Sequence, residues 1–423
     1  MKTPRKIAIS IFVAAAMVGG TDLALAGGQS NPRALAMGGA YTALAYGLEA
    51  GAYNPANLGL SFNKSFTLDF VSVGVDLKNN SFSLDDYNSY TGQFLTDADK
   101  QAILDKIPGE GLKLDVFAEA AGMNFSVWRL AFNVRGVGYS SAKIDKDPFE
   151  LLLFGNGIKP DVSLSDTRGE AEAVGDASVS YGHPLMKWQD GQLAVGATYH
   201  YLYGIAYEKV IQAEGGVFTT DTGYVGNGSV TVRSALGGSG SAVDLGAAMI
   251  FAKNLVFSAS WQNFYSKINW TKDTEESQFS FEMQPVTFEA MSDDEINDSL
   301  VENSDTTYDI EAFSTTLPSS IRLGLARIGK RTTWSFDWSQ ATSSRNGLST
   351  NPRVAAGLEY RPISLFPLRI GAATGGNRGM MFSGGLGIYL GPMHFDFAVA
   401  NHGSFMPSST KGATFAFSTG LRF

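Results

Sequence analysis

The sequence has no cysteine and only four histidines among its 423 residues. Without cysteine the chain can form neither a disulfide framework nor a thiolate metal site. The histidines are too far apart along the chain to indicate a local metal pair, so we expect no metal and no other cofactor. They are His183, His200, His394 and His402.

Beyond its N-terminal segment the sequence also lacks long apolar runs. No later stretch approaches the ~18 consecutive apolar residues that a membrane-crossing helix needs, which excludes insertion as helices. No charge block or Pro-rich linker divides the rest of the chain, which favours one large domain. Glycine is abundant, with 48 residues, and aromatic side chains make up 12% of the chain. That mixture suits many strands joined by tight turns and ringed by aromatic girdles.

The N-terminus has the pattern of a cleaved export signal. Lys2, Arg5 and Lys6 precede an apolar core from Ile7 to Val18. Ala24-Leu25-Ala26 then supplies a small-residue cleavage site. We therefore expect residues 1–26 to be a signal peptide and the mature chain to begin with the next residue.

The mature chain is acidic. Loss of three basic residues and one acidic residue with the signal peptide changes the formal net charge from -9 to -11. This charge disfavours nucleic acid as a partner. It still permits contact with outer-membrane lipid, including lipopolysaccharide through divalent cations. The sequence leaves the oligomeric state open.

Period-two alternation is clearest at the C-terminus, where it predicts a strand with one face in lipid and the other in a lumen. Phe415, Phe417, Leu421 and Phe423 share one face, whereas small or polar residues and Arg422 fall on the other. A strand that ends in a carboxy-terminal Phe resembles the signal recognised by the outer-membrane barrel assembly machinery. We therefore expect that machinery to be a partner and Phe423 to be its assembly signal.

The same alternation recurs upstream in segments of about ten residues or more, longer than the five or six that are typical of a soluble β-sandwich. An even strand number would place both chain ends on the periplasmic side. One end of the barrel then has tight turns, and the other has longer polar connections such as 81–110, 146–161 and 273–316. Residues 279–283 could form an added ribbon in the last of these. Fourteen strands are predicted, at residues 64–80, 111–127, 129–145, 162–184, 191–212, 226–252, 254–272, 317–328, 331–343, 351–361, 366–374, 379–390, 392–401 and 411–423.

Before the first predicted strand lies a stretch that is rich in small residues and has almost no charge. Asn31 followed by Pro32 predicts a helix start, and Gly38-Gly39 would interrupt that helix. The stretch ends in Asn54-Pro55-Ala56-Asn57-Leu58, whose Asn-Pro also suits a turn into the first strand. Small apolar residues on all sides suit a segment that packs in a confined space.

Two motifs in this stretch resemble the start of the FadL family of long-chain fatty-acid transporters and their relatives. They are Arg33-Ala34-Leu35-Ala36-Met37-Gly38-Gly39-Ala40-Tyr41-Thr42-Ala43 and Asn54-Pro55-Ala56-Asn57-Leu58. The resemblance implies an all-β fold: a transmembrane antiparallel up-and-down β-barrel of about 14 strands at residues 61–423. It also implies that residues 27–60 form a hatch inside the lumen. The hatch residues carried by the motifs are Arg33, Met37, Gly38, Gly39, Asn54, Pro55 and Asn57.

The resemblance implies an outer-membrane channel for hydrophobic small molecules such as long-chain fatty acids. The match is best with uncharacterised relatives, so substrate identity does not follow. The alternative is a non-transporting scaffold or attachment protein for surface or secreted proteins, which the long acidic connection from Thr271 to Thr316 favours. No Ser, His and Asp stand in a distinctive pattern, so we expect no enzyme activity.

Two kinds of feature lie in the predicted outer loops. The acidic clusters Asp97-Ala98-Asp99 and Asp293-Asp294-Glu295 lack the ligand spacing of a calcium loop, which favours solvated surface. Residues 101–107 predict a short helix, and residues 149–154 form a second apolar element. These elements either cap the barrel mouth or form an apolar entry site.

Charged residues on the polar faces of the strands are predicted to point into the lumen. Either they form ion pairs that hold hatch and wall together, or they contact substrate. Gly136 and Gly138 on one face of the third strand are a candidate weak point in the wall, or they make room for the hatch. The predicted lumen residues are Arg322, Asp337, Arg353, Glu359 and Asp396.

Overall fold

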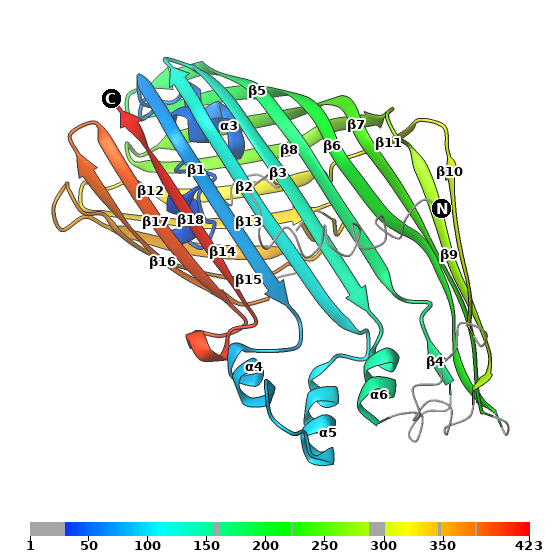
Figure 1. Ribbon diagram of the computed structural model, residues 1–423. Helices are drawn as coiled ribbons and strands as arrows, with labels where there is room; N and C mark the ends of the chain where they lie inside the picture. The colour runs from blue at the N-terminus through cyan, green and yellow to red at the C-terminus, as the bar shows by residue number, and fades with distance from the viewer. Residues whose placement is uncertain (1–29, 155–160, 221–222, 287–300, 346–347, 377–378) are drawn as a thin grey trace.

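The computed structural model describes residues 30–154, 161–220, 223–286, 301–345, 348–376 and 379–423 (Figure 1). Fourteen antiparallel strands form the barrel wall, and β1 pairs with β18 to close it. Each predicted strand overlaps one of them, so the predicted count is confirmed. The wall strands are β1 (Phe66–Asn79), β2 (Leu112–Val127), β3 (Leu130–Ile144), β5 (Arg168–Trp188), β6 (Gly191–Thr220), β7 (Gly223–Phe251), β8 (Leu255–Trp270), β12 (Ser320–Arg327), β13 (Thr332–Ala341), β14 (Arg353–Tyr360), β15 (Leu368–Gly375), β16 (Met381–Leu390), β17 (Met393–His402) and β18 (Gly412–Arg422).

The two ends of the barrel differ as the connections predict. Tight connections, such as that between β16 and β17, close one end, which we call the turn end. The longer connections gather at the other, the loop end (Figure 1). β1 starts and β18 finishes at the turn end, because Phe423 donates its backbone N–H to the carbonyl of Phe66 over 2.9 Å. The predicted signal peptide lies outside the described residues.

The two faces of the wall follow the period-two pattern. On β18, Thr414, Ala416 and Ser418 are buried toward the lumen, whereas Phe415 between them is 46% exposed on the outside. Such contiguous apolar exposure is rare on soluble proteins and suits contact with lipid. Further outward side chains of this kind are Val134, Phe336, Val354, Ile370 and Val399.

The connection 273–316 is not a plain loop, which corrects that part of the prediction. It contains β9 (Glu275–Val286) and β10 (Val301–Asp309), which pair with each other, and the short β11 (Phe313–Thr315), which pairs with β8. β9 also pairs with β7, and β4 (Asp161–Ser163) pairs with β6. We call the sheet of β4, β9, β10 and the loop-end halves of β6 and β7 the projecting sheet, because it extends beyond the wall (Figure 1). The alternative of a ribbon at residues 279–283 is confirmed, since this range lies within β9.

Three short helices stand at the loop end: α4 (Leu84–Tyr90), α5 (Asp97–Lys106) and α6 (Lys146–Phe154) (Figure 1). α5 covers residues 101–106 of the helix predicted at 101–107, and α6 includes the element predicted at 149–154, whereas α4 was not predicted. Capping boxes at Ser83 and Thr96 satisfy the first backbone N–H groups of α4 and α5. No helix of the described chain has both the length and the apolar character needed to cross a membrane.

One acidic cluster thus has a structural explanation. Asp99 is the capping partner of Thr96, and Asp97 pairs with Lys100 on the same helix over 3.1 Å. A second ion pair, Asp86 with Lys106 at 2.9 Å, joins α4 to α5. Burial would raise the pKa of Asp86, but hydrogen bonds from Lys106 and Ser83 outweigh it and hold that pKa below its usual value. The cluster at 293–295 lies outside the described residues.

Deletion of Phe423 should reduce assembly of the barrel. The residue supplies the last backbone hydrogen bond between β18 and β1, and its ring lies 5.9 Å from the ring of Phe66. We expect several-fold less folded barrel in membranes, measured as the fraction that shows heat-modifiable migration on gels. Deletion of Ser408, which is exposed in the β17–β18 connection, is the control. Equal yields for the two variants would contradict the role of the terminal Phe.

Candidate functional site

Residues 30–60 form a compact segment that we call the hatch. Its first helix, α2 (Pro32–Ala36), begins where the sequence predicts, because the Asn31 side chain accepts a hydrogen bond from the backbone N–H of Ala34. Gly38 and Gly39 have φ angles of 72° and 86°, a conformation that favours glycine and ends the helix. The helical turns η1 (Gly47–Glu49), α3 (Ala50–Tyr53) and η2 (Pro55–Gly59) follow.

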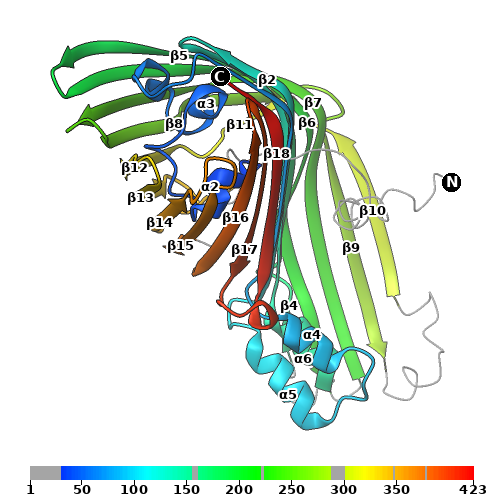
Figure 2. The same ribbon diagram turned by 90° about the vertical axis from the view of Figure 1, so that its left-hand side faces the viewer.

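The hatch lies inside the barrel and spans it. α2 contacts β15 to β18, whereas η2 contacts β5, β6 and β7 on the opposite side of the ring of strands. Figure 2 shows both ends of the segment enclosed by the wall. The apolar residues of the hatch are buried there, among them Met37, Tyr41 and Leu58, each 1% exposed.

The two asparagines of the Asn-Pro-Ala-Asn motif attach the hatch to the wall. Asn54 donates to the backbone carbonyls of Ala247 and Ala259, at 3.0 and 3.1 Å, and accepts from the N–H of Ala56. Asn57 donates to two carbonyls within the hatch and accepts from Ser258 over 3.1 Å. The turn and the hatch interpretations of this motif therefore both hold.

Wall glycines let the hatch backbone come close. A Cβ atom at Gly371 would lie 2.1 Å from the backbone N of Gly38, and one at Gly357 would lie 2.6 Å from the carbonyl O of Met37. No side chain fits at either position without displacing the hatch. The sequence analysis missed these glycines, although the signal was present as glycine on the polar face of a strand.

Gly136 and Gly138 have a different place. They alternate with Asn133 and Arg135, which point inward, so they lie on the outer face of β3. The interpretation that they make room for the hatch is therefore wrong. Both are paired on both sides, with β2 and with β5, and the irregularity of the β2–β3 ladder lies between Ala121 and Phe125. A weak point at these glycines stays a prediction.

The five predicted lumen residues lie in three places. Asp337 accepts from the backbone N–H groups of Tyr41 and Thr42 at 3.0 and 2.9 Å, and Arg353 donates to the carbonyl of Gly38 over 2.8 Å. These two residues hold hatch and wall together. Glu359 and Asp396 belong to an ion cluster at the turn end, and Arg322 lines a cavity at the loop end.

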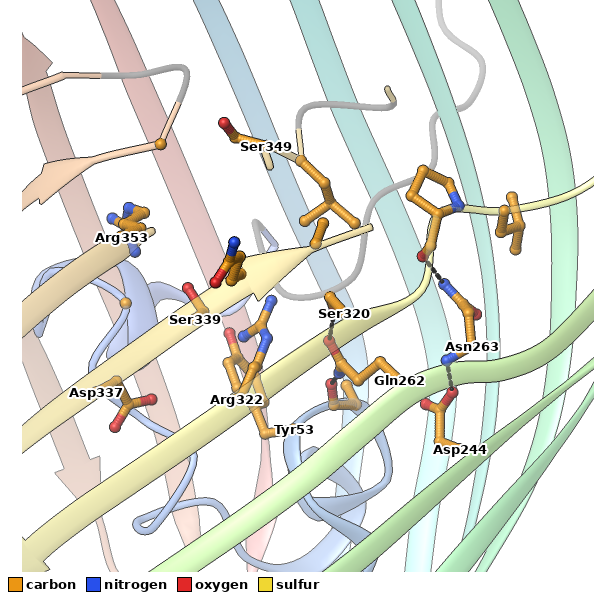
Figure 3. A pocket seen from close by; sticks show the side chains of 18 of the residues that line it. Tyr53, Asp244, Gln262, Asn263, Ser320, Arg322, Asp337, Ser339, Ser349 and Arg353 are labelled. Carbon is orange, nitrogen blue, oxygen red and sulfur yellow. Dashed lines mark hydrogen bonds between the residues drawn. The ribbon is translucent and has the colours of Figure 1, made fainter. Parts of the chain in front are cut away.

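The loop-end cavity has a volume of ≈ 190 Å³ and lies between the hatch and the barrel mouth (Figure 3). The hatch residues Leu35 and Tyr53 contribute to its floor, and Arg322 lies beside Tyr53 with its guanidinium 5.6 Å from the ring centre. The Nε of Arg322 is buried and has no hydrogen-bond partner. Burial raises the pKa of the Tyr53 phenol, while Arg322 opposes that rise, so the phenol stays protonated. Apolar lining comes from Leu202, Ala242, Leu317, Pro318, Leu348 and Met381.

A buried apolar cluster borders this cavity through Leu202 and Ala242. Its members face the lumen, where side chains that meet water would be polar. Trp270 is 0% exposed and packs on Tyr207, with ring centres 5.5 Å apart. The cluster also contains Phe117, Val137, Tyr139, Val174, Ala235 and Ile268. The cluster therefore fills this part of the lumen and meets the loop-end cavity at Leu202 and Ala242.

The connection between β13 and β14 crosses toward the far wall at the mouth. Arg345 forms ion pairs with Glu170 and with Glu172 of β5, the latter at 3.0 Å. It also donates to the carbonyl of Thr316 over 3.1 Å. These contacts place Leu348 and Ser349 over the loop-end cavity.

A second cavity, of ≈ 300 Å³, lies on the other side of the hatch; we call it the turn-end cavity. The hatch contributes Arg33 and Met37, and Gly391 and Pro392 belong to the turn between β16 and β17. The hatch thus separates a cavity that faces the loops from one that faces the turns.

Members of an ion cluster line the turn-end cavity. Arg369 is buried with Glu359 at 2.6 Å and Asp396 at 2.7 Å. Arg422 joins Asp396 at 3.3 Å to Glu49 of the hatch at 3.2 Å. The sequence analysis named Glu359 and Asp396 as lumen residues and placed Arg422 on the polar face of its strand, but it did not name Arg369 or Glu49.

The histidines are not gathered into one site. His200 lies between Asp176 and Asp244, at 3.0 and 3.2 Å, and His402 lies 2.8 Å from Asp76. His394 lies 3.4 Å from Asp69 near the turn end. Among the described residues, no three or more His, Asp or Glu side chains are arranged so that they could hold a metal ion.

A family model described as "Family of unknown function (DUF5723)" matches residues 55–235 and 221–401. The chain belongs to this family. No curated protein sequence matches this DUF5723 chain.

Solved structures share the fold of the DUF5723 chain. A FadL homologue of Pseudomonas aeruginosa has 12% identity and a TM-score of 0.55, over 95% of this chain and 100% of that one. The toluene transporter TodX of Pseudomonas putida has 12% identity and a TM-score of 0.54, over 95% and 99%. The toluene transporter TbuX of Ralstonia pickettii has 14% identity and a TM-score of 0.52, over 93% and 98%. The predicted FadL-like barrel fold is therefore confirmed.

Proposed function

We propose that this chain is an outer-membrane channel that carries small hydrophobic molecules through the barrel. The observation that supports this most directly is the loop-end cavity, which lies next to a buried, lumen-facing apolar cluster and ends at the hatch. The apolar part of its lining, at Leu202, Ala242 and Leu317, favours an apolar solute, whereas a water-filled pore gains nothing from it. The likeness in fold to the toluene transporters TodX and TbuX agrees with this function.

The size of the cavity bears on the substrate. An engineered apolar cavity of about 150 Å³ binds benzene. A cavity of ≈ 190 Å³ therefore suits one aromatic ring or a short alkyl chain better than an extended long-chain fatty acid. We propose substrates of the size of a monoaromatic hydrocarbon. Passage then requires the hatch to move, because its buried residues fill the space between the two cavities.

The proposed location is the Gram-negative outer membrane, with lipid and lipopolysaccharide around the outer apolar face and the barrel assembly machinery as the inserting partner. The mature chain should fractionate with outer membranes and migrate on gels as a heat-modifiable band. Recovery as a soluble periplasmic protein would contradict the proposal.

Uptake of radiolabelled toluene by cells that express the chain tests the channel. The substitution Leu317→Glu places a charge in the wall of the loop-end cavity. We expect uptake to fall roughly ten-fold, since the charge holds water that an apolar solute would have to displace. Ile363→Glu in the β14–β15 connection, where the side chain is 55% exposed, is the control and should leave uptake unchanged. Uptake equal to that of cells without the chain would rule out the channel.

The projecting sheet favours the second candidate function, a scaffold for surface or secreted proteins. β6 and β7 have 30 and 29 residues, far more than the ~9–11 that a strand needs to cross a membrane. Within the described chain β10 has a ladder only with β9, so its other edge can accept a further strand. Crosslinking in intact membranes followed by purification separates the two functions. A stoichiometric protein partner without toluene uptake would favour the scaffold.

A further inference from the structure

We propose that the turn-end cavity is a binding site for an oxyanion, a carboxylate or phosphate group, carried on a small apolar body. The inference goes beyond the channel function, because this cavity lies on the opposite side of the hatch from the loop-end cavity. It rests on the charge of the lining, on how its arginines are paired, and on the apolar side chains that share the lining.

The lining of the turn-end cavity is strongly basic. Among the described residues that line it are five Arg or Lys side chains, one histidine, His394, and one carboxylate, that of Glu359. The Arg and Lys residues are Arg33, Lys64, Arg361, Arg369 and Arg422. Lys64 is exposed at the rim, whereas Arg369 has a side-chain exposure of 0%.

The arginines and carboxylates form one alternating chain of ion pairs. Glu49 stands between Arg33 and Arg422, each at 3.2 Å. The next carboxylate, Asp396, stands between Arg422 and Arg369, at 3.3 and 2.7 Å. The last, Glu359, stands between Arg369 and Arg361, at 2.6 and 2.5 Å. Each carboxylate is thus shared between two guanidinium groups.

An arginine therefore stands at both ends of this chain. Four guanidinium groups share three carboxylates, so the set carries an excess of positive charge. The two terminal arginines, Arg33 and Arg361, each have a single carboxylate partner, and the Nε–H of each is buried without a hydrogen-bond partner. A buried donor of this kind is costly to leave unpaired. An oxyanion in the cavity would supply the missing acceptor.

The chemistry of the donors selects the ligand. Guanidinium groups bind carboxylate and phosphate oxygens through two parallel hydrogen bonds, which a chloride ion or a neutral group cannot reproduce. The lining also includes the apolar side chains of Met37, Leu44, Phe62, Ile328 and Met393. The cavity volume of ≈ 300 Å³ leaves room for an apolar body beside the anionic group. An alkyl carboxylate has both parts.

Binding of octanoate to the purified barrel in non-ionic detergent, measured by equilibrium dialysis, tests this site. Arg361→Gln removes one terminal guanidinium at a side chain that is 36% exposed, so the fold should persist. We expect octanoate to bind about ten-fold more weakly to this variant, because a charge-assisted bidentate contact is lost. Octanol, which has the same chain length without the charge, should bind more weakly than octanoate to the unmodified protein.

The matched control is Arg331→Gln. Arg331 is exposed at the same rim, its backbone carbonyl accepts a hydrogen bond from Arg361 N–H over 2.7 Å, and it does not line the cavity. Octanoate affinity should be unchanged in this variant. Heat-modifiable migration of both variants shows whether the barrel is folded.

Three results would overturn the proposal. The first is equal octanoate affinity in Arg361→Gln and the unmodified protein, and the second is equal affinity of the unmodified protein for octanol and octanoate. The third is loss of octanoate binding in Arg322→Gln, because it would place the ligand in the loop-end cavity. Inorganic phosphate distinguishes the source of the anion. Competition by phosphate at similar concentration would assign the site to free phosphate, and failure to compete would assign it to organic carboxylates. Because binding is measured without transport, an absence of toluene uptake would contradict the channel function and leave this site in place.

Discussion

Barrels that lack residues 29–45 should conduct ions in planar bilayers, with a conductance roughly ten-fold above that of the intact chain, since barrels of this width without a plug enclose an aqueous channel. The deletion removes α2 and the segment that hydrogen-bonds to Asp337 and Arg353. The wall itself keeps every strand ladder. Single-channel recording on purified protein measures the change.

A substitution tests the same idea without shortening the chain. Gly371→Val should displace the hatch, because the new Cβ would lie 2.1 Å from the backbone N of Gly38. Gly384→Val on the neighbouring strand is the matched control, since the nearest atom to its Cβ is the Arg369 carbonyl O at 3.8 Å. We expect raised conductance only for Gly371→Val. Unchanged conductance in a folded barrel without the hatch would mean that another element closes the lumen.

Asp396→Ala should destabilise the folded barrel by about 3–5 kcal/mol, because removal of one partner leaves buried charge without compensation. Asp396 is 0% exposed and joins Arg369 to Arg422. After the substitution Arg369 retains only Glu359 as a carboxylate partner, although its side chain has no access to water. The measurement is unfolding in urea, with the folded fraction at each concentration read from heat-modifiable migration on gels. The expected result is a lower midpoint urea concentration.

Asp190→Ala provides the comparison. Asp190 pairs with Lys253 at 3.3 Å, but the two side chains are 48% and 78% exposed, so the loss should be below about 1 kcal/mol. Both substitutions remove one Asp carboxylate from an ion pair, but the Asp396 side chain is buried and the Asp190 side chain is exposed. Similar midpoints for the two variants would show that the cluster around Arg369 is not energetically important.

The wall of the barrel was predictable because its signal is local. Alternation such as that around Phe415 needs only neighbouring residues, since successive side chains of a strand point to opposite faces. The start of α2 was predictable for a similar reason, because Asn31 and Pro32 define a helix start within a few positions. The motif match then placed the hatch in the lumen by resemblance.

The ion cluster was not predictable from local pattern. Arg422 and Glu49 are 373 positions apart and meet only when the barrel closes around the hatch. The facing of the glycines was also hard to predict. Gly371 faces the hatch and Gly136 faces outward. Glycine has no side chain whose polarity would indicate which face of the strand it lies on. The length of β9 and β10 was missed because their exposed polar residues look like a loop.

The contact between Glu49 and Arg422 has a consequence for the order of assembly. Arg422 is the last residue of β18, whereas Glu49 comes before the first strand. This contact can therefore form only after β18 has joined the wall, so it marks the closure of the ring of strands around the hatch.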